Sequence, residues 1–389
     1  MHVFEPATIG ALSLTNHFVR SATGEGLATS QGCGSPLLTK LMVRLAHGGV
    51  GLIITGHTAV SPEGRTGVRQ LCLWHADHLP ALIDMTEQVH EAGGKIVIQI
   101  SHAGIFANTL LTGEAAFGPT IRPQNDGTIC REMTRTDIRK TVGAFAIASS
   151  LARKAGFDGV QIHAAHGYLL SSFLSPHFNH RHDEYGGTVE NRARFLLEAL
   201  QAVWGSAGSD YPVLVKMNVN DFRPDGLNVK DMLKTAALLE QAGVTAVELS
   251  GGTVQSGKLI PARPGKIEPA KEGYYKEDAL YFKEEIDIPL ILVGGFRSLP
   301  TAESFLRGGI CDFIAMSRPF ICEPDLIKRW KNGHEEPSSC KSDNQCYLPV
   351  RAGKGLYCLT QVRERNVTMG KNTILNLSNH IISEAVGGR

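Results

Sequence analysis

A dense group of potential hydrogen-bond donors stands in the run His163-Ala-Ala-His166-Gly-Tyr168. Two imidazole N–H groups aimed at one point can hold a carbonyl oxygen and stabilise the enolate-like charge that grows on it. A tyrosine, which is protonated at neutral pH, can supply a proton to a neighbouring carbon. Two other interpretations stay open: the histidines are ligands of a metal ion, helped by the histidine-rich stretch 177–183, or they are structural residues.

Lys216 ends an apolar run, Val213-Leu-Val-Lys-Met-Asn218, and therefore points a cation into apolar surroundings. Burying a lysine costs free energy unless an anion meets it. The anion could be the N1 edge of a reduced flavin, while a Schiff-base lysine and a plain salt bridge are the alternatives. Gln99, at the end of another apolar run, can hydrogen-bond a flavin's pyrimidine edge through both its donor and its acceptor, or it can be structural.

Glycine and arginine end two further apolar runs, as Val293-Gly294-Gly295-Phe-Arg and Met316-Ser317-Arg318-Pro. Glycine lets backbone N–H groups reach phosphate oxygens, and arginine offers a fork-shaped cation. Neither feature is specific alone. Together, at the ends of two successive strands, they predict a site for a phosphorylated ligand.

These residues are positioned by a unit that recurs along the chain, in which an amphipathic helix ends in glycine and a run rich in Val and Ile follows. Glycine after a helix is the expected left-handed cap. The runs lack strict alternation, so we expect parallel strands buried on both faces by crossover helices. The eight expected strands span residues 17–23, 51–56, 95–100, 159–163, 212–218, 246–250, 289–295 and 312–316.

Eight such strands close a barrel, so the sequence predicts an α/β fold of the (β/α)8 TIM-barrel class. An open doubly wound sheet is the alternative, but no G-x-G-x-x-G follows the first strand. We expect the barrel in residues 1–333 and a C-terminal extension packed on it in 334–389, without a separate nucleotide-binding domain. The long segments 101–133 and 251–277 follow strands at the catalytic face, so we expect lids or substrate walls there.

Composition narrows the class of partner. The chain has 389 residues, 42% of them hydrophobic and 20% charged, as in a globular protein with a sizeable core. Its 39 basic and 38 acidic residues leave a net charge of +1, so we expect no nucleic-acid partner. No signal peptide or long apolar stretch is visible, so we expect a cytoplasmic protein with no membrane partner. The sequence leaves open whether the protein forms a homo-oligomer.

The run from His163 to Leu170, with Phe173-Leu-Ser-Pro, Asp183-Glu-Tyr-Gly-Gly and Glu190-Asn-Arg, resembles the Old Yellow Enzyme family of NAD(P)H:flavin oxidoreductases. The resemblance extends from Phe4-Glu-Pro-Ala-Thr-Ile-Gly to the segment around Arg318. It implies noncovalently held FMN, and ping-pong use of NAD(P)H and an activated alkene at one flavin face. It also makes the segment 181–185 a structural element over the barrel top, so we expect no metal site.

The resemblance also assigns roles to residues. His163 and His166 would bind the substrate carbonyl, and Tyr168 would donate the proton. The remaining assigned residues would hold the cofactor. They are Ser21, Ala22, Thr23, Gly56, Gln99 and Lys216 around the isoalloxazine, and Gly294, Gly295, Ser317 and Arg318 at the phosphate.

The C-terminal cysteines resemble the iron–sulfur segment of the longer, dienoyl-CoA-reductase-like branch of that family. Cys340, Cys346 and Cys358 are present, but Asp343 stands at a usual cysteine position. Because a four-cysteine cluster needs four soft ligands, we expect no iron–sulfur cluster. The FAD/NAD domain of that branch is also not visible, which leaves direct reduction by NAD(P)H as the expected electron source.

The function predicted from these features is an FMN-dependent oxidoreductase that takes hydride from NAD(P)H and reduces a carbonyl-conjugated C=C bond. A near alternative is a flavin dehydrogenase or demethylase that acts on a specific metabolite at the same site. A histidine-rich, metal-dependent barrel hydrolase or lyase is the alternative from another class. The last alternative is a barrel that binds its ligand without catalysing a reaction.

Overall fold

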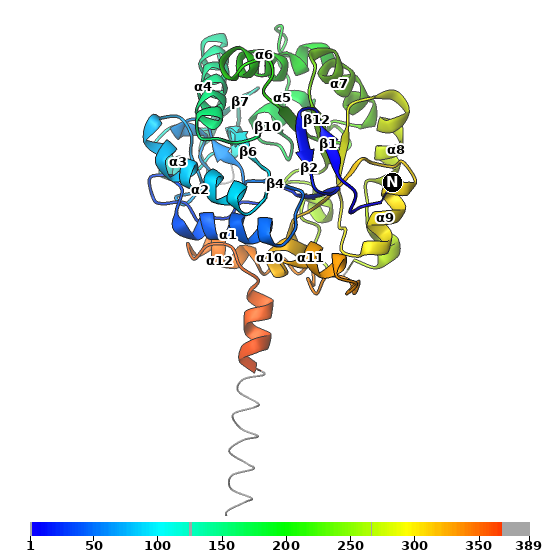
Figure 1. Ribbon diagram of the computed structural model, residues 1–389. Helices are drawn as coiled ribbons and strands as arrows, with labels where there is room; N and C mark the ends of the chain where they lie inside the picture. Colours follow the sequence, from blue (N-terminus) through cyan, green and yellow to red (C-terminus); the bar gives the residue numbers. More distant parts are fainter. Residues whose placement is uncertain (1, 124–126, 266, 368–389) are drawn as a thin grey trace, which may run out of the picture.

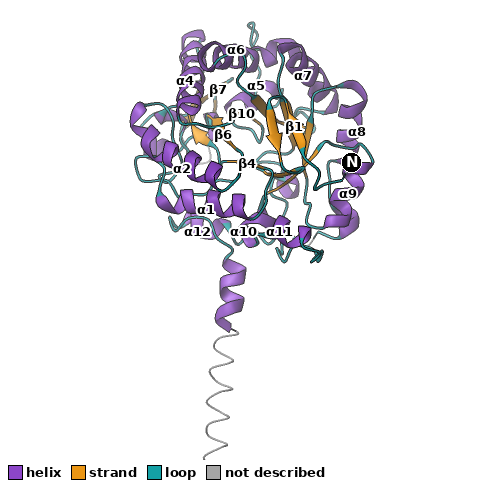
Figure 2. Cartoon of the chain, in the orientation of Figure 1, coloured by secondary structure: helices purple, strands orange, loops and turns teal. Residues whose placement is uncertain are grey.

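The computed structural model describes residues 2–123, 127–265 and 267–367. Parallel strands form a closed ring in which the last strand pairs with the first, and helices surround it (Figures 1 and 2). In order around the ring the strands are β3 (Phe18–Arg20), β4 (Leu52–Ile54), β6 (Ile96–Ser101), β10 (Gly159–Ala164), β11 (Val213–Asn218), β12 (Ala246–Ser250), β13 (Leu290–Val293) and β14 (Phe313–Met316). The predicted (β/α)8 barrel is confirmed, with each of the eight strands inside or within one residue of its expected range.

Local sequence accounts for where the helices begin and end. The long helix after the third barrel strand starts at a capping box between Thr134 and Asp137. The helix that follows β11 ends at Gly243, whose φ of 87° is the left-handed cap predicted for such glycines. The main helices are α1 (Pro36–His47), α2 (Leu79–Glu91), α4 (Arg135–Lys154), α6 (Val189–Ala207), α7 (Val229–Ala242), α8 (Lys276–Glu285) and α9 (Leu299–Arg307).

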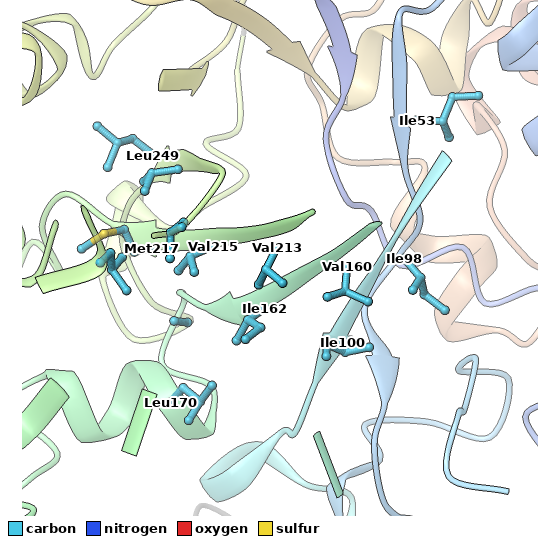
Figure 3. Packing of buried hydrophobic residues seen from close by; sticks show 14 of the residues in the cluster. Ile53, Ile98, Ile100, Val160, Ile162, Leu170, Val213, Val215, Met217 and Leu249 are labelled. Carbon is cyan, nitrogen blue, oxygen red and sulfur yellow. The ribbon is translucent and has the colours of Figure 1, made fainter. Parts of the chain in front are cut away.

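Side chains alternate between the two faces of each barrel strand, and this alternation positions the site. Val213, Val215 and Met217 pack outward against the helices (Figure 3), whereas Leu214 belongs to a separate cluster inside the barrel. Because the side-chain period of a strand is two residues, Lys216 shares the inward face of Leu214. The hairpin of β1 (Ala7–Ile9) and β2 (Leu12–Leu14) contributes apolar residues to the inner cluster.

The shorter elements lie mostly in the connections. The segment 101–133 carries a small three-stranded sheet. Short helices follow β14 at one side of the barrel, and a further helical stretch covers residues 359–367 (Figure 1). These elements are β5 (Thr58–Ala59), η1 (Pro62–Gly64), η2 (Ala76–His78), η3 (Gly104–Phe106), α3 (Thr109–Thr112), β7 (Phe117–Gly118), β8 (Arg122–Pro123), β9 (Ile129–Glu132), α5 (Leu169–Leu174), η4 (Gly257–Leu259), η5 (Pro269–Lys271), α10 (Arg318–Cys322), α11 (Leu326–Lys331) and α12 (Tyr347–Arg351).

The chain beyond α11 returns to the barrel. The backbone carbonyl of Arg297 accepts a hydrogen bond from the amide of Ser338 at 2.7 Å, and the Arg297 guanidinium donates to the Ser338 carbonyl at 2.6 Å. The amide of Gly265 donates to the carbonyl of Ser342 at 3.0 Å. We therefore propose residue 333 as the end of the barrel proper, with the extension held against its surface. Within the described residues, no helix combines the length and the apolar character needed to cross a membrane.

Candidate active site

A cavity of about 730 Å³ opens where the barrel strands end. This volume lies in the range typical of small-molecule and cofactor sites. The cavity gathers residues from distant parts of the chain, as expected for the C-terminal face of a barrel. Of the residues singled out from the sequence, its lining contains Ser21, Ala22, Thr23, Gln99, His163, His166, Tyr168, Lys216, Gly295, Ser317 and Arg318.

The three predicted donors meet at the end of β10. The ring centroid of His163 lies 5.1 Å from that of His166 and 4.9 Å from that of Tyr168. His166 has a φ of 66°, which is uncommon without glycine, and its amide donates to Asn218 Oδ1 at 3.1 Å. This turn brings the second imidazole back beside the first. Nδ1 of His163 is buried and has no hydrogen-bond partner within the described residues.

Burial fixes the charge state of these donors. It lowers the pKa of His163 well below 6.5, and the neighbouring His166 lowers it further. The pKa of His166 is also lowered well below 6.5, by burial and then by Lys216. Burial raises the pKa of Tyr168 to about 12. Near neutral pH the site therefore holds two uncharged imidazoles, each with one N–H, and a protonated phenol.

Lys216 has an anionic partner inside the barrel. Its Nζ lies 2.8 Å from Glu248 Oε1 and 2.8 Å from Ser21 Oγ, and the serine hydroxyl donates to the same carboxylate oxygen at 2.5 Å. The glutamate is 0% exposed and the lysine 3%. Of the roles considered for Lys216, the salt bridge is therefore present, and the lysine also lines the cavity.

Gln99 is tied into the same network. Its Nε2 donates to Gln161 Oε1 at 2.7 Å, and Gln161 Nε2 donates to Glu248 Oε2 at 2.8 Å. Sequence reasoning missed Gln161 and Glu248. The available sequence signal was a polar residue inside an apolar strand. In the structure, Glu248 lies directly opposite Lys216 in the register of β11 and β12.

Gly56 and Gly294 do not line the cavity. The amide of Gly56 donates to Glu25 Oε1 at 2.8 Å, and a Cβ at this position would lie 2.6 Å from the Thr23 carbonyl oxygen and would also overlap the Glu25 carboxylate. Arg20 in turn pairs with Glu25 at 3.0 Å in a buried salt bridge. Gly56 thus permits close packing behind the wall that Thr23 forms.

His57 faces the same cavity, although the sequence had suggested no role for it. Gln70 Nε2 lies 2.8 Å from His57 Nδ1, and its amide group is a donor there, which places the ring proton on Nε2. The ring stacks edge-on with Tyr168 at 5.4 Å, and burial lowers its pKa to about 4. His57 is therefore a third neutral imidazole beside the phenol.

The predicted phosphate end lies between the barrel and the C-terminal segment. Ser317 Oγ is 2.6 Å from Thr23 Oγ1. Nη1 of Arg318 donates to the Arg263 carbonyl at 2.9 Å, to the Ser342 carbonyl at 3.1 Å and to Asn344 Oδ1 at 2.9 Å. Gly295, with a φ of 81°, adopts a backbone conformation that favours glycine. Gly295, Ser317 and Arg318 thus line the same cavity, with Nη1 of Arg318 held by oxygen atoms of the protein.

The two long segments contribute differently to the site. Residues Val254, Ile260, Pro261, Ala262 and Tyr274 of the segment 251–277 line the cavity, as predicted for a substrate wall. No described residue of 101–133 does so. Arg181, which hydrogen-bonds the Met133 carbonyl at 2.7 Å, instead ties that segment to the loop after α5. The C-terminal segment supplies a wall that the sequence did not indicate, through Tyr347, Leu348 and Arg351.

The metal interpretation of the histidines has no matching arrangement in the described ranges, where no three His, Cys, Asp or Glu side chains are placed to hold one metal ion. His177 instead pairs with Asp225 at 2.8 Å, and Asp183 pairs with Arg181 at 2.9 Å.

Sequence comparisons place the chain among flavin enzymes. Residues 2–336 match the family model for the NADH:flavin oxidoreductase / NADH oxidase family. The 4,4'-dithiodibutanoate disulfide reductase of Rhodococcus erythropolis is 32% identical over 90% of this chain and 93% of that protein. The NADPH dehydrogenase of Geobacillus thermodenitrificans is 39% identical over 72% of this chain and 78% of the relative. The chain spans about half of some longer relatives, such as 53% of the NADH oxidase of Thermoanaerobacter brockii.

Solved structures agree with the sequence comparisons. A 2-naphthoyl-CoA reductase complexed with 2-naphthoyl-CoA aligns with a TM-score of 0.86 and 26% identity, over 92% of this chain and 56% of that one. The old yellow enzyme homologue from Zymomonas mobilis aligns with a TM-score of 0.73 and 27% identity, over 86% and 93% of the two chains. A morphinone reductase in complex with tetrahydroNAD has a TM-score of 0.71 and 25% identity over 86% and 91%.

Proposed function

The chain belongs to the NADH:flavin oxidoreductase / NADH oxidase family, and we propose from this premise that it reduces carbonyl-conjugated C=C bonds. Family membership makes it an oxidoreductase of the Old Yellow Enzyme type that uses FMN as cofactor and NAD(P)H as electron donor. A metal-dependent hydrolase is therefore not retained. The acceptor and the roles of individual residues are the proposed part.

The residues present fit FMN. The cavity is large enough for a cofactor, and its lining includes an amide, an ammonium, a guanidinium and several hydroxyl groups, which supports this proposal. Ser21, Ala22, Thr23, Gln99 and Lys216 would hold the isoalloxazine, and Gly295, Ser317 and Arg318 would hold the phosphate. Gly56 and Gly294 lie behind this lining, so their proposed role is to let the wall pack closely rather than to touch the cofactor.

The chain's own residues would bind and protonate the substrate. When bound, FMN supplies the hydride that it has taken from NAD(P)H. His163 and His166 would each donate one N–H to the substrate carbonyl oxygen, where negative charge grows as the alkene is reduced. The Ser250 hydroxyl lies 2.8 Å from His166 Nε2, and by donating to that nitrogen it would leave the proton on Nδ1.

Tyr168 would deliver the proton to the α-carbon. Its raised pKa keeps the phenol protonated at neutral pH. The three neighbouring imidazoles, His57 included, carry lowered pKa values and are neutral, so none of them would draw the phenolic proton away by charge. The single observation that carries the proposal is the unpartnered, buried Nδ1 of His163 within this group of donors.

Ligand titration tests the carbonyl-binding pair. The FMN-loaded His163→Ala/His166→Ala variant should bind a phenol and cyclohex-2-enone about 10- to 100-fold more weakly, since each lost hydrogen bond is worth about 1 kcal/mol. The readout is the change of the visible flavin absorbance with ligand concentration. His182→Ala, at an exposed position, is the matched control and should titrate like the parent protein. Unchanged affinity in the double variant would remove both histidines from the role.

A disulfide is the second candidate acceptor. The relative named 4,4'-dithiodibutanoate disulfide reductase shares 32% identity over nearly its whole length. Reduction of R–S–S–R by NAD(P)H and one proton gives two thiols and NAD(P)⁺, so the same donors and electron source would serve. Comparing NAD(P)H consumption with enones and with 4,4'-dithiodibutanoate separates the two, because the proposed function predicts faster turnover of the enones.

A further inference from the structure

A second cavity, of about 470 Å³, adjoins the active-site cavity. Gly24, His57 and Arg351 line both cavities, so the two spaces meet at these residues. A Cβ at position 24 would lie 3.3 Å from His57 Nε2, so a side chain there would take up the space that glycine leaves beside the imidazole. A ligand held by His163 and His166 therefore has room to extend past His57 into the second cavity.

The walls of the second cavity are fixed by their own contacts. One wall is the loop 65–70, in which the Arg65 guanidinium donates to the Val68 carbonyl at 2.5 Å. Helices α1 and α12, which lie along the same side of the barrel in Figure 1, also contribute to the lining. A Cβ at Gly26 would lie only 2.8 Å from Val350 Cγ1, so α12 packs closely on the chain before α1. The cavity is thus formed before any ligand arrives.

The second cavity carries positive charge that the protein does not neutralise. Arg69 and Arg351 line it, and neither side chain has an ion pair or a hydrogen bond within the described residues. The one carboxylate in the lining belongs to Glu25, which is 5% exposed and already pairs with Arg20 at 3.0 Å. Two guanidinium groups are therefore free to bind an anion from outside the chain.

His57 adds an uncharged donor where the two cavities meet. The backbone amide of Thr66 can only donate, and it donates to Gln70 Oε1 at 2.7 Å, so the Gln70 NH₂ group faces His57 Nδ1 at 2.8 Å. This arrangement leaves the ring proton of His57 on Nε2. Nε2 has no hydrogen-bond partner within the described residues. Its N–H can therefore meet an acceptor atom of a ligand that passes between the cavities.

Apolar side chains make up much of the remaining lining. They are Leu27, Leu38, Val68, Leu71 and Val350. Contact with such side chains favours a hydrocarbon chain over a polar one. A ligand that matches the second cavity has an apolar spacer and an anionic end.

We propose that the second cavity binds an anionic group that the acceptor substrate carries, joined through a short apolar spacer to the unsaturated carbonyl group. Arg69 and Arg351 bind the anion, and His57 contacts the part of the substrate between the two cavities. This inference rests on the proposed function, because the carbonyl-binding histidines define where the substrate begins. The phosphates of NAD(P)H are another source of negative charge, so the experiment separates the two.

The experiment uses phenols as probes that bind in place of the carbonyl substrate. The FMN-loaded full-length protein is titrated at pH 7 with 4-hydroxyphenylacetate, 3-(4-hydroxyphenyl)propanoate and 4-(4-hydroxyphenyl)butanoate, and with the methyl ester of each acid. The readout is the visible flavin absorbance. For at least one chain length the carboxylate should bind roughly 10-fold more tightly than its ester, about 3-fold for each partly solvated ion pair. Salt at about 0.5 M should weaken this preference.

Variants assign the preference to the two arginines. Arg69→Gln and Arg351→Gln should each lower it to about 3-fold, and the double variant should bind acid and ester equally. Because acid and ester share the phenol and the spacer, their ratio cancels changes in the shape of the wall. Arg139→Gln removes an exposed positive charge from α4, outside both cavities, and is the matched control that keeps the full preference.

Turnover extends the test from probes to substrates. With 6-oxohept-4-enoate, an enone that carries a carboxylate, kcat/KM should be roughly 10-fold higher than with its methyl ester, and this advantage should be lost in the double variant. Stopped-flow reduction by NADH and by NADPH supplies the other arm. If the arginines instead bind the phosphates of NAD(P)H, the double variant should need a higher NAD(P)H concentration for half-maximal reduction, and the parent should show no preference for carboxylates.

Three further results would overturn the inference. The first is equal binding of acid and ester by the parent protein at every chain length. If the esters still bind and neutral enones are still reduced, this result leaves the proposed function standing. The second is a carboxylate preference that survives in the double variant, since the anion would then lie elsewhere. The third is that neither acids nor esters perturb the flavin and no enone is reduced, in which case the proposed function fails as well.

Discussion

Removing the negative charge of Glu248 should destabilise the barrel strongly. In Glu248→Gln the side chain keeps its size, but Lys216, which is 3% exposed, loses its anionic partner. The amide would also place an NH₂ group where Ser21, Gln161 and Lys216 now all donate to carboxylate oxygens. At least one donor would then face another donor.

The magnitude follows from the distance and the burial. With an effective dielectric constant of about 20, opposite charges 2.8 Å apart attract by roughly 6 kcal/mol. Desolvation of both ions offsets part of this attraction in the native protein. Breaking a buried pair from one side nevertheless costs about 3–5 kcal/mol, because the remaining charge stays buried and unpaired. We expect the free energy of unfolding of Glu248→Gln to fall by that amount.

A double-mutant cycle in urea measures the interaction. Unfolding of the apoprotein, with FMN removed so that ligand binding does not contribute, is followed for Glu248→Gln, Lys216→Met and the double variant. The double variant should be more stable than the sum of the single losses implies, by at least about 2 kcal/mol, because no unpaired charge is left. Arg44→Gln is the matched control. Its partner Asp325 and Arg44 itself are more than half exposed, and the loss should be under about 1 kcal/mol.

Additive losses in the cycle would refute this reasoning. Additivity would mean that Lys216 and Glu248 do not interact appreciably, and that water or another group compensates each charge separately. A loss in Glu248→Gln no larger than that in Arg44→Gln would have the same meaning.

Three further predictions concern single sites. Tyr168→Phe should slow reoxidation of the flavin by an alkene at least about 100-fold and leave flavin reduction by NAD(P)H unchanged, because only reoxidation needs the phenolic proton. Stopped-flow measurement of the two half-reactions checks this, and slowed flavin reduction would contradict the assignment. Burial lowers the pKa of His102 from 6.5 to about 4. Between pH 6.5 and pH 4 this histidine is therefore protonated in the unfolded chain but neutral in the folded one, and the free energy of unfolding falls as the pH drops through this range. His102→Gln should remove about 3 kcal/mol of that fall in urea titrations at pH 7 and pH 4, and an unchanged slope would exclude His102 as its source. Gly56→Ala should lower the free energy of unfolding by about 1–3 kcal/mol because its Cβ meets the Thr23 carbonyl, whereas Gly143→Ala, in open space on α4, should raise it by up to about 1 kcal/mol. Equal effects would show that the segment around Thr23 moves to accommodate the Cβ.

The sequence predicted the barrel because its signals are local. Most strands are apolar runs preceded by a helix that ends near glycine, and such patterns need no knowledge of distant contacts. The positions of the cavity residues followed from the same pattern, since all parallel strands of a barrel end at one face. His163, Lys216 and Arg318 could thus be placed together although they come from three different strand ends.

The sequence did not predict partners set by register or by chain return. Glu248 meets Lys216 because the stagger between β11 and β12 places these two residues opposite each other, and the local sequence of either strand does not encode that stagger. Cys322 and Cys358 line the same small cavity because the chain folds back after α11, through a segment with little regular structure. Gly56 was assigned to the cofactor by the family resemblance, but the need for a small residue at this position comes from Glu25 and Thr23, which lie about 30 residues away in the sequence.

The salt bridge of Lys216 and a role toward the flavin are compatible, and the geometry shows how. An ammonium group has three N–H donors, and the contacts to Ser21 and Glu248 use two of them. The third is available for an atom in the cavity that the lysine lines. Glu248 orients the lysine before any ligand arrives, so the protein carries the cost of burying the cation during folding. A ligand with an anionic edge then meets a charge that is already in place, as preorganised electrostatic binding requires.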